Sequence, residues 1–127
     1  MVAVIDAVGE RSIDNDAAGR FLSNPSGVAI GGYFGEAPSG YLIGYLVTRA
    51  DGRLMLIIYD VGVAPSSRRR GVASGMVSEA LSRAARDGAS KAWVLLDRMN
   101  EPARQLYRST GAEPSGVDDL VMWWPLP

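Results

Sequence analysis

The sequence contains no cysteine and no histidine in 127 residues. Without cysteine there is no disulfide framework and no thiol nucleophile, and without histidine no Ser–His catalytic pair can form. The two absences together exclude a zinc site made of Cys and His ligands, and we expect no metal site. Any acid–base chemistry must therefore use Asp, Glu, Tyr, Lys or water.

A surplus of charge and a long apolar run are also missing. Thirteen Lys and Arg residues accompany 14 Asp and Glu residues, so the formal net charge is −1. Nucleic-acid binding usually requires an excess of basic side chains, so we expect no nucleic-acid partner. The longest apolar runs are too short to cross a bilayer, and the first residues, MVAVIDAVGERSIDND, lack the basic start and apolar core of a signal peptide. We therefore expect a cytoplasmic protein without a membrane partner.

What is present is the composition of an ordinary globular protein, with 47% hydrophobic and 21% charged residues. A chain of this length predicts one domain, residues 1–127, that can bury a substantial core. Runs of β-like composition predict strands over 2–8, 28–34, 41–50, 53–63, 91–96 and 120–126. Helical spacing and capping residues predict helices from Ser12 or Asp14 to about Leu22, from 72 to just before Gly88, and over 101–110. This order predicts a mixed α/β fold.

The run LMLIIYDVGV, residues 54–63, is apolar at nearly every position. A strand that is buried on both faces has this composition. The three runs between 28 and 63 are separated by short turns that contain Gly, Pro or Asp, which predicts an antiparallel meander. We therefore expect 54–63 to lie in the middle of a sheet with helices on both faces.

The stretch APSSRRRGVASGMVSEAL, residues 64–81, connects that strand to the second helix. The first turn of a helix leaves backbone N–H groups unpaired, and the helix dipole adds positive charge there. Gly71, Ala73 and Ser74 are small enough to let an anion approach the backbone, and the three arginines add forked donors. A solvated basic turn before a helix would show the same pattern. The P-loop pattern and the dinucleotide pattern Gly-x-Gly-x-x-Gly are absent from this turn.

Two motifs carry a resemblance to a known family. The residues from Arg68 to Ala73 match Arg/Gln-x-x-Gly-x-Gly/Ala, the acyl-CoA signature of the GNAT superfamily of acetyl-CoA-dependent N-acetyltransferases. The stretch NEPARQLYRSTGAE, residues 100–113, is similar to the Asn-x-x-Ala-x-x-Leu-Tyr-x-x-x-Gly element of the same family. The two motifs lie between residues 68 and 113. The resemblance implies an enzyme with a GNAT-type fold, in which helices flank a mixed, mostly antiparallel central sheet.

The resemblance also implies acetyl-CoA as the cofactor and a role for each matched position. Backbone groups of Val61 and Val63 would pair with the pantetheine arm, and Asn100 would contact it as well. Amides from about Arg69 to Ser74 would hold the pyrophosphate. The cofactor-binding residues implied in this way are Val61, Val63, Arg68, Arg69, Arg70, Gly71, Val72, Ala73, Ser74 and Asn100.

The family resemblance further implies that Tyr107 protonates the departing thiolate of coenzyme A. Asn100 and Tyr107 are seven residues apart, which is close to two helical turns, so both can face the same way. A thiol has a pKa of about 8.5 and a tyrosine hydroxyl a pKa of about 10, so the proton transfer is feasible without histidine. The alternative is a tyrosine that packs beside Ala103 and Leu106 with its hydroxyl in water.

Asp60 is the one charged residue in the apolar run 54–63. Burying a carboxylate without partners is costly, and desolvation raises the pKa of the group. A carboxyl group with a raised pKa is a candidate general base. Because only a neutral amine can attack an acetyl group, a nearby residue must accept a proton, directly or through water. We predict that Asp60 orients or deprotonates the acceptor amine. The alternative is a carboxylate that bonds to backbone or arginine and only closes the strand end.

The sequence from Tyr41 to the C-terminus resembles the aminoglycoside 3-N-acetyltransferases, which also have a Tyr-Asp pair before an Arg-Arg turn and a short hydrophobic last strand. An aminoglycoside is a polycation and needs an acidic cleft. The acidic residues in or beside segments near the predicted active end are Glu36, Asp60, Asp97, Glu101, Asp118 and Asp119. The chain departs from these relatives in its short N-terminal part, which has room for about one helix instead of two, and in a longer link before the last strand.

Other acceptors and other classes of protein stay open. A polyamine, a small amine metabolite or a protein N-terminus would suit the same chemistry. A non-catalytic acyl-CoA-binding module would keep the arginine–glycine turn but would not need Asp60 or Tyr107. The final LVMWWPLP contains two of the three tryptophans, and exposed aromatic residues at an edge strand often pack against another subunit. We therefore predict a homodimer that uses this region.

Overall fold

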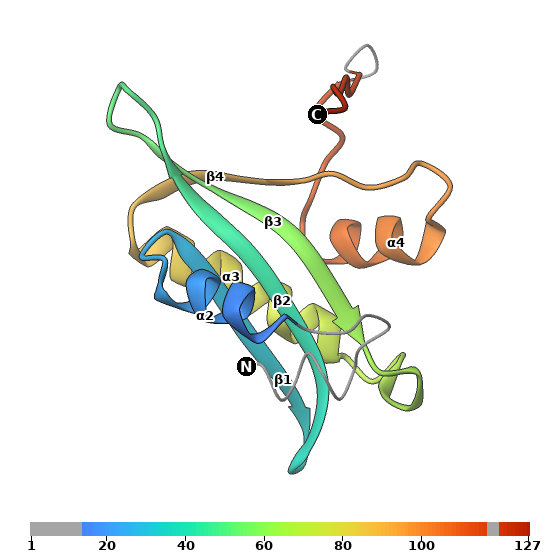
Figure 1. Ribbon diagram of the computed structural model, residues 1–127. Helices are drawn as coiled ribbons and strands as arrows, with labels where there is room; N and C mark the ends of the chain where they lie inside the picture. The colour runs from blue at the N-terminus through green and yellow to red at the C-terminus, as the bar shows by residue number, and fades with distance from the viewer. Residues whose placement is uncertain (1–13, 117–119) are drawn as a thin grey trace.

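The structure is a computed structural model and describes residues 14–116 and 120–127. Its centre is a four-stranded sheet with the order β1-β2-β3-β4 (Figure 1). β2 runs antiparallel to both β1 and β3, whereas β4 runs parallel to β3. The predicted mixed, mostly antiparallel sheet is confirmed. In chain order the elements are α2 (Asn15–Ser23), β1 (Gly27–Phe34), β2 (Ala37–Thr48), β3 (Leu54–Val63), the 3-10 turn η1 (Pro65–Ser67), α3 (Val72–Arg86), β4 (Ala89–Val94) and α4 (Glu101–Ser109).

The predicted helices and the predicted meander are present, with small shifts at their ends. Asp14 is the N-cap of α2, because its carboxylate accepts hydrogen bonds from the amides of Asp16 and Ala17. β4 begins and ends two residues earlier than the predicted 91–96. The strand predicted over 2–8 and the alternative cap Ser12 lie outside the described residues.

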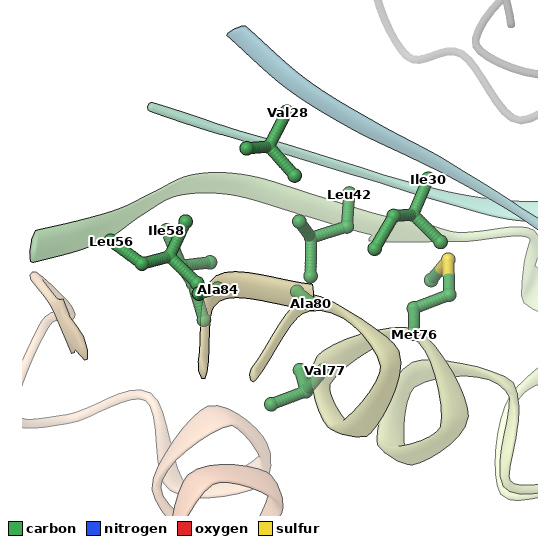
Figure 2. Close-up of a cluster of buried hydrophobic side chains, with 9 residues drawn as sticks. All are labelled: Val28, Ile30, Leu42, Leu56, Ile58, Met76, Val77, Ala80 and Ala84. Atoms are coloured by element: carbon green, nitrogen blue, oxygen red, sulfur yellow. The ribbon is translucent and has the colours of Figure 1, made fainter. Parts of the chain in front are cut away.

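The core lies between α3 and one face of the sheet. Leu42 from β2 and Leu56 from β3 are fully buried, and Val77 of α3 packs against the same cluster (Figure 2). Complete burial of a leucine side chain contributes roughly 1.5–3 kcal/mol. The apolar helix face predicted from the spacing is confirmed. The buried residues of the cluster are Val28, Ile30, Leu42, Leu56, Ile58, Met76, Val77, Ala80 and Ala84.

β3 is buried on one face and not on both, so that prediction was wrong. Ile58 is buried against α3, whereas Tyr59 is 73% exposed. Successive side chains of a strand alternate between faces, so Tyr59 faces away from the core. Gly44 pairs with Ile58 and Ile43 pairs with Asp60, so Tyr59 is also the extra residue of a β-bulge. On the outer face α2 packs over β1, with the edge of the Phe21 ring on the Tyr45 ring, and Tyr59 stays exposed.

β3 and β4 pair over only part of the length of β3. Their ladder ends at the pair Ile58 and Val94, and β3 continues to Val63. After Val94 the chain leaves the sheet and leads into α4 (Figure 1). In the described part of the chain, the last five residues of β3 therefore have no strand beside them on the β4 side. An opening is left there between β3 and α4.

The strand predicted over 120–126 is not formed, and this prediction was wrong. The segment extends away from the sheet (Figure 1), and the side chains of Trp123 and Trp124 are 77% and 76% exposed. Pro125 and Pro127 have no backbone N–H to give to a ladder. Apolar composition alone therefore does not make this segment a strand.

Two glycines at the start of α3 predict opposite effects for the same substitution. Gly71 is the N-cap with a φ of 80°, Gly75 lies inside the helix, and a Cβ at either position would meet no atom within 4 Å. Only the backbone conformation therefore decides the outcome. Gly71→Ala should lower the free energy of unfolding by roughly 1–2 kcal/mol, whereas Gly75→Ala should raise it by about 1 kcal/mol. Urea unfolding measures both, and shifts of the same sign would contradict this account.

Candidate active site

A cleft of about 1400 Å³ occupies the opening between β3 and α4. The end of β3, the start of α3, the segment after β4 and the first two turns of α4 line it. The structure thus brings together residues that are far apart in the sequence. The predicted site residues that line the cleft are Asp60, Val61, Val63, Arg68, Arg69, Gly71, Val72, Ala73, Ser74, Asn100 and Tyr107.

The end of β3 borders the cleft with its backbone. The side chains of Val61 and Val63 pack against the core cluster, so their polar groups toward the cleft are those of the main chain. Because the ladder with β4 has already ended at Ile58, this stretch can pair with an extended ligand in place of a strand. A pantetheine arm, which carries amide groups along its length, suits such an edge.

The N-terminus of α3 is open where it meets the cleft. Asp14 caps α2 and Asn100 caps α4 with side-chain oxygens, but Gly71 gives α3 no side-chain cap. The residues of its first turn, Val72 to Ser74, line the cleft instead. A helix start of this kind presents backbone N–H groups and partial positive charge to an anion.

The three arginines before α3 do not share one position. Arg68 and Arg69 line the cleft, and Arg69 has a left-handed backbone with a φ of 63°. The guanidinium of Arg70 lies instead over the ring of Phe34, with its Cζ 4.8 Å from the ring centroid. The structure therefore places two of the three predicted cations beside the open helix end and the third outside the cleft lining.

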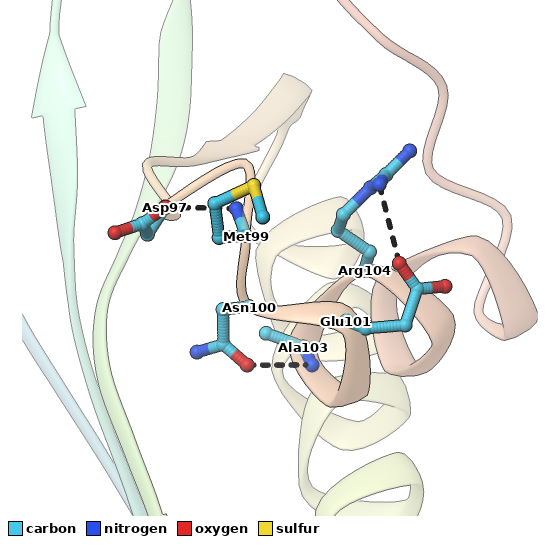
Figure 3. Close-up of polar contacts among 6 residues, drawn as sticks. All are labelled: Asp97, Met99, Asn100, Glu101, Ala103 and Arg104. Atoms are coloured by element: carbon cyan, nitrogen blue, oxygen red, sulfur yellow. Dashed lines mark hydrogen bonds and ion pairs between the residues drawn. The ribbon is translucent and has the colours of Figure 1, made fainter.

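Asn100 lies at the N-cap of α4. Its Oδ1 accepts a hydrogen bond from the Ala103 amide over 3.2 Å (Figure 3). Just before it, Asp97 Oδ1 accepts from the Met99 amide over 2.8 Å, which fixes the turn that leads into the helix. The cap engages the carbonyl oxygen of Asn100, so a ligand contact would use its amide nitrogen. Capping and the predicted cofactor contact are thus compatible.

Tyr107 is half-buried in the cleft wall formed by α4. Desolvation by burial raises the pKa of Tyr107 above its usual value near 10, and the negative charge of Asp60 raises it further. The hydroxyl is therefore held in its protonated form, and the two predicted catalytic residues act on each other through space. Tyr107 also packs against the core cluster, as Leu106 does, so both the acid role and the packing alternative stay predictions.

Asp60 is half-buried, so it is less enclosed than the apolar run predicted. Its Oδ2 accepts a hydrogen bond from the Tyr41 hydroxyl over 3.0 Å. Tyr41 also lines the cleft, although neither sequence motif includes it. The contact depends on a bulge in β3 that shifts the register, and no pattern in the sequence marked that bulge.

Carboxylates as well as arginines line the cleft. Of the predicted acidic residues, Asp60, Asp97 and Glu101 line the cleft. Glu101 also forms an ion pair with Arg104 over 3.2 Å (Figure 3). Glu36 is not part of the lining, which agrees with the alternative of a solvated surface charge. Asp118 and Asp119 lie outside the described residues.

The sequence and the fold both match known proteins. The model of the acetyltransferase (GNAT) family matches residues 7–112. An aminoglycoside acetyltransferase from an uncultured soil metagenomic sample, solved in complex with trehalose, has the same fold with a TM-score of 0.79 at 18% identity, over 98% of this chain and 82% of that chain. The enzyme has also been solved in complex with sisomicin.

Two further solved structures show that this fold serves different acceptors. A second aminoglycoside acetyltransferase from an uncultured soil metagenomic sample has a TM-score of 0.79 at 24% identity, over 100% of this chain and 89% of that chain. A ribosomal-protein-alanine N-acetyltransferase from Brucella melitensis biovar Abortus 2308 has a TM-score of 0.73 at 18% identity, over 96% and 90%. No curated protein matches the sequence. In the described part of the chain, no helix has the length and apolarity that a membrane span requires.

The raised pKa of Tyr107 has two causes that can be separated. Asp60→Asn removes the charge but keeps the burial, so the pKa of Tyr107 should fall and still remain above about 10. Absorbance at 295 nm against pH, with the curve of Tyr107→Phe subtracted to remove the other four tyrosines, isolates this group.

The same shift predicts a change of stability with pH. A pKa that is higher in the folded than in the unfolded chain gives stability that is complete below about pH 10 and is lost as the pH rises through the folded value. Native protein should therefore lose more stability above pH 10 than Tyr107→Phe does. An equal loss in both proteins, or an unchanged Tyr107 titration in Asp60→Asn, would contradict the assignment.

Proposed function

The chain belongs to the acetyltransferase (GNAT) family, and from this premise we propose that it transfers the acetyl group of acetyl-CoA to a primary amine by direct attack, with an aminoglycoside as acceptor. Family membership supports an acyltransferase. The use of acetyl-CoA, the identity of the acceptor and the role of each residue go beyond family membership and form our proposal. The observation that carries it is the set of charged groups in one cleft, with Arg68 and Arg69 beside an open helix start and three carboxylates in the same lining.

The two arginines in the cleft lining and the open start of α3 suit coenzyme A. Amides of the first turn of α3, together with Arg68 and Arg69, would hold the pyrophosphate, because charge-assisted hydrogen bonds to phosphate are about twice as strong as neutral ones. The backbone of Val61 and Val63 would pair with the pantetheine arm, and the amide nitrogen of Asn100 would donate to it. Arg70 would act at a distance, by holding Phe34 and the turn that carries Arg69.

Acetyl-CoA supplies a thioester whose carbonyl carbon an amine can attack. Asp60 would orient the acceptor and accept the proton that its ammonium group must lose. A backbone N–H near Val61 or Gly62 would stabilise the negative charge that forms on the carbonyl oxygen. Each of these groups lies on the stretch of β3 that follows the bulge, so one short segment positions base and oxyanion donor together.

Tyr107 would hold a proton at its hydroxyl for the sulfur. A tyrosine hydroxyl is already protonated at neutral pH, as a donor must be, and the raised pKa of Tyr107 makes it a weaker acid. With a thiol pKa of about 8.5 and a tyrosine pKa above about 10, complete transfer is uphill by at least about 2 kcal/mol. A cost of this size slows a reaction roughly thirtyfold, which leaves the step compatible with ordinary turnover.

The three carboxylates in the cleft lining support an aminoglycoside as the acceptor. Asp60, Asp97 and Glu101 line the cleft on the side of β3 and α4 and would bind several ammonium groups at once. Two structures with the same fold are aminoglycoside acetyltransferases, and one of them was solved with sisomicin. By the resemblance of the sequence, the 3-amino group is the proposed position. A small amine metabolite or a protein N-terminus offers a single ammonium group to these carboxylates, whereas a polyamine offers several and is the alternative acceptor that charge alone does not separate from an aminoglycoside.

An acceptor panel tests the proposal. Purified protein and acetyl-CoA are offered sisomicin, a gentamicin-type aminoglycoside, spermidine, amino acids and short peptides, with release of free thiol recorded. We expect fastest release with the aminoglycosides, and a loss of roughly 10²–10⁴-fold in Tyr107→Phe if it is the acid. Turnover of spermidine or peptides alone would remove the aminoglycoside assignment.

Calorimetry with coenzyme A separates an enzyme from a binding module. Arg69→Ala should weaken binding about tenfold, because it removes a charged donor from the cleft, and the neighbouring Arg70→Ala should weaken it less. Coenzyme binding without thiol release on any amine would indicate a non-catalytic module. No heat with coenzyme A would overturn the whole assignment.

We also propose a homodimer, because the C-terminal segment 120–127 has little to bury it within one chain. Its large apolar side chains are 65–86% exposed, and apolar patches of this kind mark interfaces. Light scattering should give twice the chain mass of 13.5 kDa, and the variant with both Trp123→Glu and Trp124→Glu should give one chain mass. A native monomer at micromolar concentration would contradict the proposal.

A further inference from the structure

The side chains of Tyr41 and Asp60 form a hydrogen bond that has no role in the acetyl transfer proposed above. Tyr41 lies on β2 and Asp60 on β3, and the Tyr41 hydroxyl donates to Asp60 Oδ2 over 3.0 Å. They are not opposite each other in the sheet, because Tyr41 is paired with Gly62 and Asp60 with Ile43. The hydrogen bond is therefore a diagonal contact across two strands, and both residues line the cleft.

Gly62 makes this diagonal contact possible. A Cβ at position 62 would lie 2.4 Å from Cε1 and 2.9 Å from the hydroxyl oxygen of Tyr41. Atoms do not approach that closely, so any other residue at this position would displace the ring. The Tyr41 ring thus lies across bare backbone, and its hydroxyl reaches the neighbouring carboxylate.

The hydrogen bond between Tyr41 and Asp60 also requires the bulge at Tyr59. Without the extra residue, the pairing that joins Gly44 to Ile58 would continue and would set Asp60 opposite Leu42. Leu42 is fully buried in the core under α3, where a carboxylate would be costly. Because one inserted residue reverses which face each later side chain takes, the bulge turns Asp60 to the face on which Tyr41 lies.

We propose that Tyr41 is a positioning residue that holds Asp60 for the acceptor amine, an inference that rests on the acetyl-transfer function proposed above. The hydroxyl occupies Oδ2 and restrains the rotation of the carboxylate. Oδ1 is then the oxygen that accepts from the acceptor ammonium group. Asp60 would meet the amine, and Tyr41 would act on the amine only through Asp60.

Tyr41→Phe tests the role, because it removes the hydroxyl and keeps the ring over Gly62. With acetyl-CoA and sisomicin, or spermidine if only spermidine is acetylated, kcat should fall roughly five- to thirtyfold. The KM for acetyl-CoA should stay unchanged. In the Asp60→Ala background the same substitution should cause no further loss, since no carboxylate remains to be held. A native kcat in Tyr41→Phe, or an equal loss in both backgrounds, would overturn the proposal.

Tyr45→Phe is the matched control. Tyr45 lies on the same strand four residues along, its ring contacts the rings of Phe21 and Tyr59, and it is not part of the cleft lining. Loss of its hydroxyl should leave kcat and both KM values as they are in the native chain. A loss equal to that of Tyr41→Phe would indicate a general effect on β2 and would overturn the specific role of Tyr41.

Urea unfolding tests the pair without any substrate. Tyr41→Phe should lower the folding equilibrium constant about three- to tenfold in the native chain and less than twofold in Asp60→Ala. Absence of this coupling would overturn the positioning role whether or not the protein is active. Coupling in a protein that acetylates no amine would support the Tyr41–Asp60 pair and overturn the acetyl-transfer function instead.

Discussion

The end of the ladder between β3 and β4 is the constraint on which the site depends. Up to Ile58 and Val94 the two strands satisfy each other, and beyond that pair they separate. Beyond Ile58, β3 is paired with β2 on one side and with no described strand on the other, and its backbone groups on that side need other partners because such groups are costly to leave unpaired. The cleft, the open start of α3 and the cap of α4 all border this stretch of β3. A ligand with amide groups can complete the sheet there.

The bulge at Tyr59 decides which side chains meet in that opening. Before it, Leu56 and Ile58 face the core, and after it Val61 and Val63 do. The apolar residues therefore stay against α3 on both sides of the bulge, and Asp60 is directed to the outer face. One inserted residue thus allows a strand with almost no polar positions to bury its apolar side chains and still present a carboxylate to the cleft.

The sequence predicted the parts of the site that depend on local pattern. Helix starts at Val72 and Glu101 followed from capping and apolar spacing, and the two motifs identified Arg68, Arg69, Asn100 and Tyr107 among the residues that line the cleft. Non-local features were missed. The position of Arg70 depends on the Phe34 ring of β1, which is distant in the sequence. Whether residues 120–126 form a strand depends on whether a sheet edge lies beside them. Composition does not encode these distances.

A protein without histidine must divide acid and base work between residues with distant pKa values. In the function that we propose, Asp60 accepts the proton of the amine and Tyr107 donates one to sulfur, so each side chain has a single task. Their mutual effect strengthens this division, because the charge of Asp60 raises the pKa of Tyr107 and keeps its proton in place. Histidine performs both tasks by changing its state near pH 7. With two groups that each keep one state, the orientation of Asp60 by neighbours such as Tyr41 becomes the variable that the fold can adjust.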